Sequence, residues 1–191
     1  MVEEELQELN DMIVKEISEL GGSAIGLNGK DKKIIQAEKK KAKIDLGLVG
    51  HIVEINTEPI LDELKGENIV VMLPMGRGAA DKKTYNVNAD EAAALLSSSL
   101  KAEKLVLLTN VKGILRRAED PHSFISTLTI KEAQGLIDSK IIQQGMIPKV
   151  LACINALEKG VKKTHIIDAR TPHALLLEIF TDQGIGTEIS K

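Results

Sequence analysis

Short apolar runs alternate with amphipathic segments along this chain, and this alternation restricts the folds that it can adopt. Residues 69–73 and 105–108 are unbroken apolar runs, which are typical of strands covered on both faces. Residues 89–100 lie between them and repeat Ala and Leu with helical spacing. Strands that alternate with helices indicate an α/β fold with a mostly parallel central sheet.

The first part of the chain contains further regular elements. Residues 2–20 place apolar side chains three and four positions apart and end at Gly21 and Gly22, which predicts one amphipathic helix. Residues 32–56 combine glycines with β-branched residues and are expected to form hairpins. Residues 75–83 are expected to form a Gly-rich loop.

Later elements are marked by caps and turn residues. Thr129 and Glu132 have the spacing of a capping box, and a charged loop is expected before them. We expect further helices over residues 57–64, 129–137, 145–157 and 173–180. We expect further strands over residues 23–27, 165–168 and around Glu188.

Composition excludes several classes of protein. The 191 residues include one Cys, so no internal disulfide is expected, which favours a reducing compartment. A net charge of −3, with one Tyr, two Phe and no Trp, argues against a nucleic acid partner. The apolar runs are far shorter than the ~20 residues of a membrane span, and the acidic start does not resemble a secretory signal. We expect a soluble cytoplasmic protein without membrane association.

The glycine-containing loops do not match the common phosphate-binding motif. A Walker loop ends in Gly-Lys followed by Ser or Thr, but Asp31 follows Gly29 and Lys30. Ala24 stands where the first glycine of that motif belongs. The four histidines are scattered along the chain, so we predict no metal site among its residues.

One polar stretch, TYNVNAD, carries more information. Its residues Asn86, Asn88 and Asp90 alternate with less polar ones directly before a predicted helix. Asn88 suits a helix cap, and Asp90 in the first turn interacts favourably with the helix dipole. These structural roles leave Asn86 unexplained, so a binding role is the alternative.

A second stretch, QQGMIPKV, places Lys149 in the first turn of a predicted helix. A cation there opposes the helix dipole and needs a compensating anion. A phosphate held at the helix N-terminus would be such an anion. The other interpretation is a solvated surface lysine, and the residues alone leave both open.

Six motifs occur in order along the chain: GLNGKD, DLGLVG, TYNVNAD, LTNVKGIL, QGMIPKV and HIIDARTPHALLLEIFTDQGIGTEI. With these motifs the sequence resembles the acetylglutamate kinases of the amino acid kinase family. The resemblance implies a three-layer αβα sandwich in two lobes, residues 1–102 for the amino acid substrate and dimerisation and residues 103–191 for the nucleotide. It also implies that ATP with Mg²⁺ phosphorylates the side-chain carboxylate of N-acetyl-L-glutamate in arginine biosynthesis.

The resemblance assigns roles to individual residues. Lys149 would stabilise the transferred phosphoryl group, and Asp90 would be the second catalytic residue, keeping that lysine charged and oriented. Asn86 and Asn88 would bind the substrate. Nucleotide-binding roles fall to Thr109, Asn110, Val111, Gly113, Leu115, Ile141, Gln143, Gly145 and Met146. An arginine effector would contact His173, Glu178 and Gly186.

The sequence also departs from the family pattern. It starts at the helix that follows the family's first strand and glycine-rich loops, so we expect it to lack a second catalytic lysine and a substrate-binding arginine. Asn110 stands where aspartate is usual, and Gln144 and Ala169 stand where glycine is usual. Because so few aromatic residues are present, we expect adenine to lie among aliphatic side chains rather than on a ring.

Two alternatives to this function remain open. One is a non-catalytic paralogue or fragment that binds nucleotide or arginine and assembles with a full-length partner. The other is a kinase for a related amino acid such as aminoadipate, which TYNVNAD fits less well. The resemblance further implies a homo-oligomer, either a dimer or a hexamer, in which the first helix packs across a dimer twofold.

Overall fold

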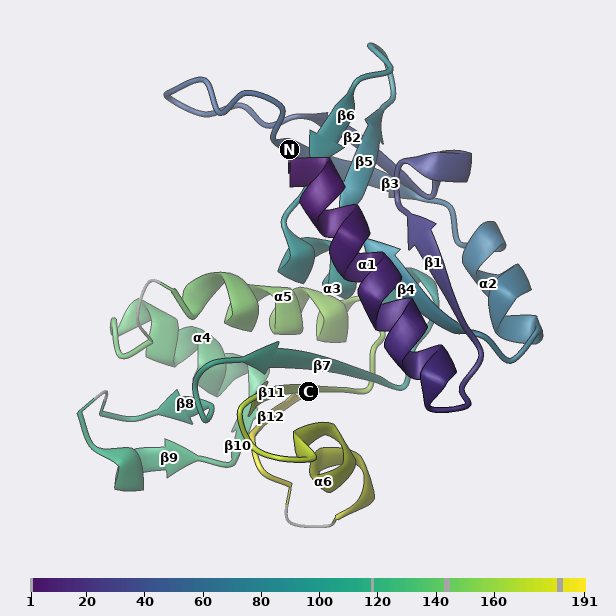
Figure 1. Cartoon of the computed structure of the whole chain (residues 1–191). Helices are drawn as coiled ribbons and strands as arrows, with labels where there is room; N and C mark the ends of the chain where they lie inside the picture. The colour runs from purple at the N-terminus through teal and green to yellow at the C-terminus, as the bar shows by residue number, and fades with distance from the viewer. Residues whose placement is uncertain (1, 118, 143–144, 182–183) are drawn as a thin grey trace. The chain divides into compact units, whose positions relative to one another are not determined.

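The computed structural model describes residues 2–117, 119–142, 145–181 and 184–191. The chain forms two compact units, Met1–Ala92 and Ala93–Lys191. The division falls inside helix α3 (Ala89–Ser99), upstream of the predicted division between residues 102 and 103. Helices and strands alternate in both units, which confirms the predicted α/β class (Figure 1). Within the described ranges, no helix is both long and apolar enough to cross a membrane.

In the amino-terminal unit, helix α1 (Val2–Glu19) packs against two parallel strands, β1 (Ala24–Asn28) and β4 (Ile69–Leu73) (Figure 1). Helix α2 (Glu58–Lys65) also contacts β4. The prediction that β4 is covered on both faces is wrong, because Ile69 is 51% exposed and residues 70–72 are only half-buried. This sheet has two strands, so the helices that pack on it leave part of its surface open.

A polar side chain fixes the contact between α1 and its sheet. Asn10 is buried, and its Nδ2 donates a hydrogen bond to the backbone oxygen of Val71 at 2.9 Å. Its Oδ1 lies against Gly26 in β1, where a Cβ atom would be 2.0 Å from that oxygen. The close approach of helix to strand therefore depends on glycine at position 26.

The second sheet of this unit has the strand order β3-β2-β5-β6. Strands β2 (Ile35–Lys39) and β3 (Gly50–Ile55) pair antiparallel, which confirms the predicted hairpin. A short 3-10 helix, η1 (Asp31–Lys33), precedes β2.

Strands β5 (Met75–Gly78) and β6 (Thr84–Asn86) form a second hairpin. The prediction of a loop over residues 75–83 is therefore wrong in its first part. A Cβ atom on Gly76 would be 2.7 Å from the Cβ of Ala37, so this glycine serves close packing between strands rather than a turn.

The carboxyl-terminal unit is built on a four-stranded sheet in the order β10-β12-β11-β7. Strands β7 (Lys104–Thr109) and β11 (Lys163–Asp168) are parallel, and β12 (Thr187–Ser190) runs antiparallel to β11 and parallel to β10 (Thr127–Thr129).

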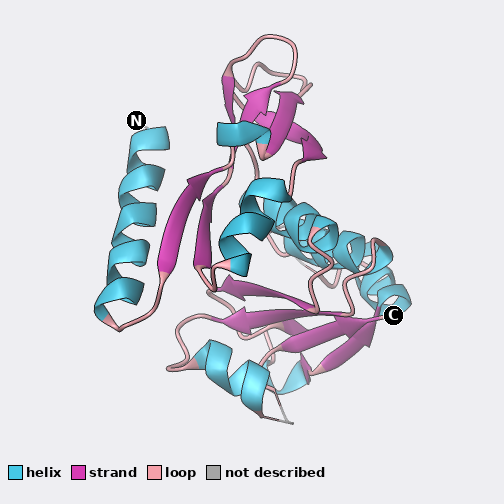
Figure 2. Ribbon diagram, turned by 90° about the vertical axis from the view of Figure 1, so that its right-hand side faces the viewer, coloured by secondary structure: helices cyan, strands magenta, loops and turns pink. Residues whose placement is uncertain are grey.

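Helices cover both faces of this sheet. In Figure 2, α4 (Ile130–Asp138) and α5 (Ile147–Glu158) lie on one side and α6 (Ala174–Phe180) lies on the other. This unit is therefore a three-layer α/β/α arrangement, as the resemblance implied. Its core is centred on α5, where Val150, Cys153 and Leu157 are completely buried.

The long elements of this unit match the sequence prediction, and the short ones do not. Helix α4 begins with the predicted capping box: Thr129 Oγ1 accepts the Glu132 N–H at 3.2 Å, and Glu132 Oε2 accepts the Thr129 N–H at 2.8 Å. The segment predicted as a charged loop contains the 3-10 helix η2 (Pro121–Ser123) and the strands β9 (Phe124–Ile125) and β10. Strand β8 (Ile114–Leu115) was not predicted either. Strands of two or three residues are too short to show an alternating pattern.

We expect Gly26→Ala to destabilise the amino-terminal unit. The new Cβ would displace the Asn10 side chain from its hydrogen bond, so the free energy of unfolding should fall by about 1–3 kcal/mol. Gly135→Ala is the matched control, because open space surrounds the missing Cβ of Gly135 in α4. This control should keep or slightly raise the stability. Urea denaturation measures both, and an unchanged midpoint for Gly26→Ala would contradict the packing described.

Candidate functional site

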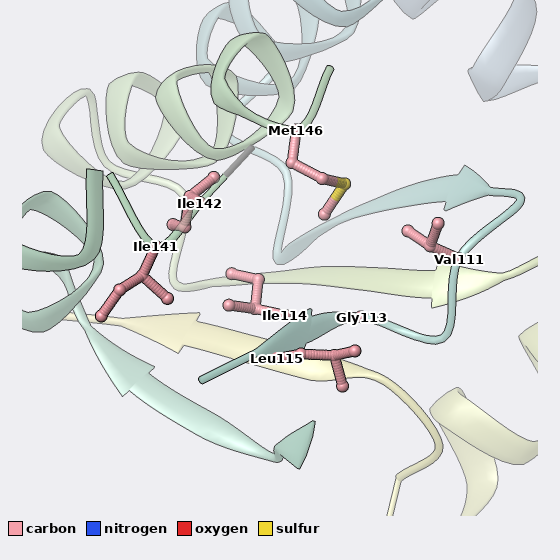
Figure 3. A pocket seen from close by; sticks show the side chains of 7 residues that line it. All are labelled: Val111, Gly113, Ile114, Leu115, Ile141, Ile142 and Met146. Carbon is pink, nitrogen blue, oxygen red and sulfur yellow. The ribbon is translucent and has the colours of Figure 1, made fainter. Parts of the chain in front are cut away.

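A pocket in the carboxyl-terminal unit is lined by apolar side chains from separate segments of the chain (Figure 3). Its volume is about 150 Å³. The segments are the turn after β7, strand β8 and the stretch that leads into α5. The lining residues are Val111, Gly113, Ile114, Leu115, Ile141, Ile142 and Met146. Apart from Gly113 and the thioether of Met146 the lining is aliphatic, so the pocket suits a flat apolar group.

The pocket brings together residues that the sequence separates. The resemblance assigned Val111, Gly113, Leu115, Ile141 and Met146 to a nucleotide, and all of them line this pocket. Two further lining residues, Ile114 and Ile142, belong to segments 110–115 and 141–143, which the resemblance as a whole assigned to the nucleotide site. Both are buried neighbours of the individually assigned residues.

Other predicted nucleotide residues do not line the pocket. Thr109 is half-buried at the end of β7, whereas Asn110 and Gly145 are exposed. Gln143, which the resemblance also assigned to the nucleotide, and its neighbour Gln144 lie outside the described residues. A nucleotide contact at these positions stays a prediction.

The wall that β8 provides depends on a glycine. Gly113 has φ +141°, a backbone conformation that other residues rarely adopt. A Cβ atom there would lie 2.6 Å from Thr187 Oγ1 and 2.7 Å from Phe124 Cε2. Glycine therefore lets the turn after β7 pass close to the neighbouring strands.

The hydroxyl of Thr187 joins three strands behind this wall. Its Oγ1 accepts a hydrogen bond from the Ile114 N–H at 2.8 Å and donates one to the Ile125 carbonyl oxygen at 2.7 Å. The Thr187 side chain is completely buried, so losing these bonds would leave a backbone group without water as a replacement. Thr187 thereby ties the hairpin of β8 and β9 to β12.

Lys149 lies in the first turn of α5, as the sequence predicted, and it is half-buried. Met146 is the residue that precedes this helix, and it also lines the pocket. The N-terminus of α5, which is the positive end of the helix dipole, is therefore next to the pocket.

The polar residues of TYNVNAD all lie in the amino-terminal unit. Asn88 Oδ1 accepts the Glu91 N–H at 3.0 Å, which confirms its role as a cap for α3, and Asp90 follows in the first turn. Asn86 ends β6, and its backbone N–H donates to the Leu48 oxygen at 2.9 Å. Within the described residues its side-chain amide makes no hydrogen bond, so this amide is available to form hydrogen bonds with a ligand.

Two of the predicted effector residues lie together, and a histidine joins them. Glu178 is buried, and its Oε2 accepts the Ile185 N–H at 2.7 Å and the Gly186 N–H at 3.2 Å. Its Oε1 lies 2.5 Å from Nδ1 of buried His165. The third predicted residue, His173, is exposed at the start of α6. Sequence reasoning missed His165, because nothing local in the chain pairs it with Glu178.

An ion pair stands at the end of β11. Asp168 lies opposite Thr109 in the parallel register, and its carboxylate accepts hydrogen bonds from Arg170 Nε at 2.9 Å and Nη2 at 2.8 Å. These hydrogen bonds lower the pKa of the Asp168 carboxyl from 3.8 to about 2. Ala169 donates its N–H to the Thr109 oxygen at 2.8 Å, which holds this segment against the end of β7.

Comparison with known proteins shows the family. The sequence model described as the amino acid kinase family matches residues 1–168. This chain belongs to the amino acid kinase family.

The relatives of this amino acid kinase family member confirm the resemblance seen in the motifs. The acetylglutamate kinase of Petrotoga mobilis is 52% identical over 183 residues, which cover 96% of this chain and 61% of that protein. An N-acetylglutamate synthase from Neisseria gonorrhoeae complexed with coenzyme A and N-acetyl-glutamate has a TM-score of 0.82 at 29% identity, covering 98% of this chain and 43% of that one. The complex of that synthase with coenzyme A and L-arginine has a TM-score of 0.76 at 30% identity, covering 89% and 38%. The chain thus has the amino acid kinase fold and spans 61% of the length of the Petrotoga kinase.

In this amino acid kinase family member, Thr187→Val should destabilise the carboxyl-terminal unit. Valine keeps the shape of threonine but leaves the buried Ile114 N–H without its partner, so the free energy of unfolding should fall by about 1–3 kcal/mol. Thr127→Val is the control, because Thr127 is exposed on β10. Chemical denaturation followed by circular dichroism compares them, and equal stabilities of the two variants would contradict the role of Thr187.

The pair of Asp168 with Arg170 should make part of the stability depend on pH. The folded-state pKa of about 2 lies below the ordinary 3.8, so the ionised carboxylate stabilises the fold above pH 3.8. This contribution is lost as the pH falls from 3.8 towards 2. The difference in unfolding free energy between wild type and Asp168→Asn should be constant above this window and shrink within it. A carboxyl titration by NMR that gives Asp168 a pKa of 3.8 or higher would contradict the ion pair.

Proposed function

We propose that this chain serves the ATP-dependent phosphorylation of the side-chain carboxylate of N-acetyl-L-glutamate. The observation that carries the proposal is the aliphatic pocket next to the N-terminus of α5, formed by residues that the acetylglutamate kinase resemblance assigns to ATP. Identity of 52% to the Petrotoga kinase supports the same reaction. The reaction belongs to arginine biosynthesis.

The pocket suits the adenine of ATP. A purine ring is flat with apolar faces, so aliphatic side chains such as Leu115 and Ile141 can bury it through hydrophobic and dispersion contacts. Met146 adds a flexible, polarizable side chain that adjusts to the ring. Binding of adenine between aliphatic side chains requires no aromatic residue. This mode of binding suits a chain that has only three Tyr and Phe residues, Tyr85, Phe124 and Phe180, and no Trp.

The phosphates of such a nucleotide would extend toward the first turn of α5. Backbone N–H groups and the dipole at a helix N-terminus favour anions. Lys149 adds a full positive charge there, and phosphoryl transfer requires positive charge near the equatorial oxygens of the transferred group. We therefore assign Lys149 to that phosphoryl group rather than to solvent.

The amino acid substrate is assigned to the lobe of residues 1–102, and the nucleotide to residues 103–191. The amides of Asn86 and Asn88 would donate hydrogen bonds to N-acetyl-L-glutamate, and Asp90 would be the second catalytic residue. Mg²⁺ would enter on the ATP phosphates, which is its usual mode in kinases. Among the described residues no group of three or more His, Cys, Asp or Glu side chains could hold an ion.

A second candidate function follows from the length of the match. A chain that spans 61% of the Petrotoga kinase could bind ATP or arginine without turnover and assemble with a full-length partner. Its arginine site would include Glu178 and Gly186, with His173 at the start of α6. The Neisseria synthase that was complexed with L-arginine, at 30% identity, supports such a site.

We further propose that the chain works in the cytoplasm as a homo-oligomer, either a dimer or a hexamer. Helix α1 leaves apolar side chains exposed, with Leu9 47% and Met12 53% accessible. Burying these side chains against a second copy would remove apolar surface from water, which favours association.

A coupled assay with ATP and N-acetyl-L-glutamate tests the catalytic proposal. Lys149→Ala should lower kcat about 100-fold or more, because it removes a positive charge that acts on the transition state. Lys159→Ala is the control and should keep full activity, since Lys159 is an exposed lysine at the opposite end of α5. Wild-type turnover no higher than that of Lys149→Ala would contradict catalysis. Calorimetry that shows ATP or arginine binding without turnover would then support the second function.

A further inference from the structure

The amino-terminal unit contains a hollow whose chemistry is opposite to that of the apolar pocket. It lies among η1, strand β2 and the turn between β5 and β6, and its volume is about 450 Å³. Its charged lining residues are Lys30, Asp31, Lys32, Lys33, Arg77 and Lys82. Positive side chains therefore outnumber the single carboxylate, in a chain whose net charge is −3.

Much of this positive charge has no internal partner. Lys30 pairs with Glu3 of α1. In the part of the chain that the structure describes, Lys32, Lys33 and Arg77 make no ion pair. Like charges held close together repel one another, so an anion in the hollow would relieve the repulsion.

Two acidic side chains on neighbouring segments, Asp81 in the turn between β5 and β6 and Glu54 on β3, already accept hydrogen bonds from other groups. Asp81 accepts hydrogen bonds from the Tyr85 hydroxyl at 2.7 Å and from the Lys83 N–H at 3.1 Å, and these bonds lower the pKa of Asp81. Glu54 on β3 accepts a hydrogen bond from the side-chain amide of Gln36. Neither carboxylate lines the hollow. Among its described lining residues, Asp31 supplies one negative charge, and a bound anion would offset the remaining positive charge.

Three of the lysines hold an unfavourable backbone conformation. Lys32, Lys33 and Lys82 have φ of 49°, 56° and 60°, in the left-handed region. Glycine, asparagine and aspartate adopt this region more readily than lysine does. Residues held in such conformations are concentrated at ligand clamps and active sites. Here they bring cationic side chains from two separate turns to one hollow.

The strand that carries Arg77 is a fixed support. Arg77 lies opposite Gln36 in the parallel pairing of β5 with β2. The next residue, Gly78, is buried, and a Cβ atom there would be 2.1 Å from Asp81 Oδ1. The backbone at Arg77 and Gly78 is thus closely packed, which favours a fixed position for the Cα and Cβ atoms of Arg77.

We propose that this hollow binds a small polyanion that carries two or more phosphate groups. The planar guanidinium of Arg77 suits bidentate contact with phosphate oxygens, and the lysines add point charges around it. A monocarboxylate would offset little of this charge, whereas a diphosphate or triphosphate concentrates several negative charges in a small volume. The lining residues all belong to the amino-terminal unit, so the site is distinct from the apolar pocket and goes beyond the proposed kinase function.

Calorimetric titration of the full chain with tripolyphosphate tests the site. All proteins carry Lys149→Ala, so that the lysine assigned to the phosphoryl group does not contribute. One saturable site is expected, and Arg77→Gln with Lys33→Gln should weaken its affinity about tenfold or more. The control pair, Lys41→Gln with Lys43→Gln, removes the same charge from exposed positions between β2 and β3 and should change the affinity by no more than about twofold. Thermal melts by circular dichroism verify that both pairs fold.

Titration with ATP in the same proteins distinguishes the source of the phosphates. An ATP site lost in the Arg77→Gln and Lys33→Gln pair indicates that nucleotides occupy the hollow. If this pair loses tripolyphosphate binding but keeps ATP binding, the hollow binds a free polyphosphate rather than a nucleotide. Either result supports the proposal. No saturable tripolyphosphate binding, or equal weakening by the two charge-matched pairs, would overturn it. Neither failure affects the Lys149 activity assay, so the two proposals are tested separately.

Discussion

The parallel pairing of β7 with β11 determines where the functional segments of the carboxyl-terminal unit lie. Its register runs from Lys104 opposite Lys163 to Thr109 opposite Asp168, so both strands end at the same edge of the sheet. The turn after β7 leads from that edge into the apolar pocket, and the segment after β11 carries the ion pair of Asp168. Helix α5 packs against both strands of this pair and α6 packs against β11 on the other face, whereas Leu108 of β7 is 52% exposed. The site therefore depends on the sheet rather than on a separate loop structure.

Glycines opposite buried polar side chains are a second constraint, and both units use it. In the amino-terminal unit Asn10 lies against Gly26, and in the carboxyl-terminal unit Thr187 lies against Gly113. In each case the polar oxygen occupies space that a Cβ atom would need, and the same side chain hydrogen-bonds to a backbone group of a neighbouring strand. Such contacts fix a specific packing where apolar side chains would allow several.

Local signals in the sequence predict the long elements, because those signals act within a few residues. The apolar run 105–108 and the capping box at Thr129 are examples, and the structure has a strand and a helix start there. The β8 and β9 hairpin escapes prediction because strands of two residues have no period. The contact of His165 with Glu178 also escapes, because it requires β11 and α6 to meet in space. The pocket residues came from the family resemblance, whereas composition alone indicated only that aliphatic side chains would replace aromatic rings.

The central claim is that the adenine of ATP lies among aliphatic side chains beside the N-terminus of α5. Methyl NMR of protein labelled at Ile, Leu and Met, titrated with ATP, tests this claim most directly. We predict that the methyl signals of Leu115, Ile141 and Met146 shift together and show nuclear Overhauser contacts to the adenine protons. Shifts confined to methyl groups outside the pocket, with none at these residues, would contradict the claim.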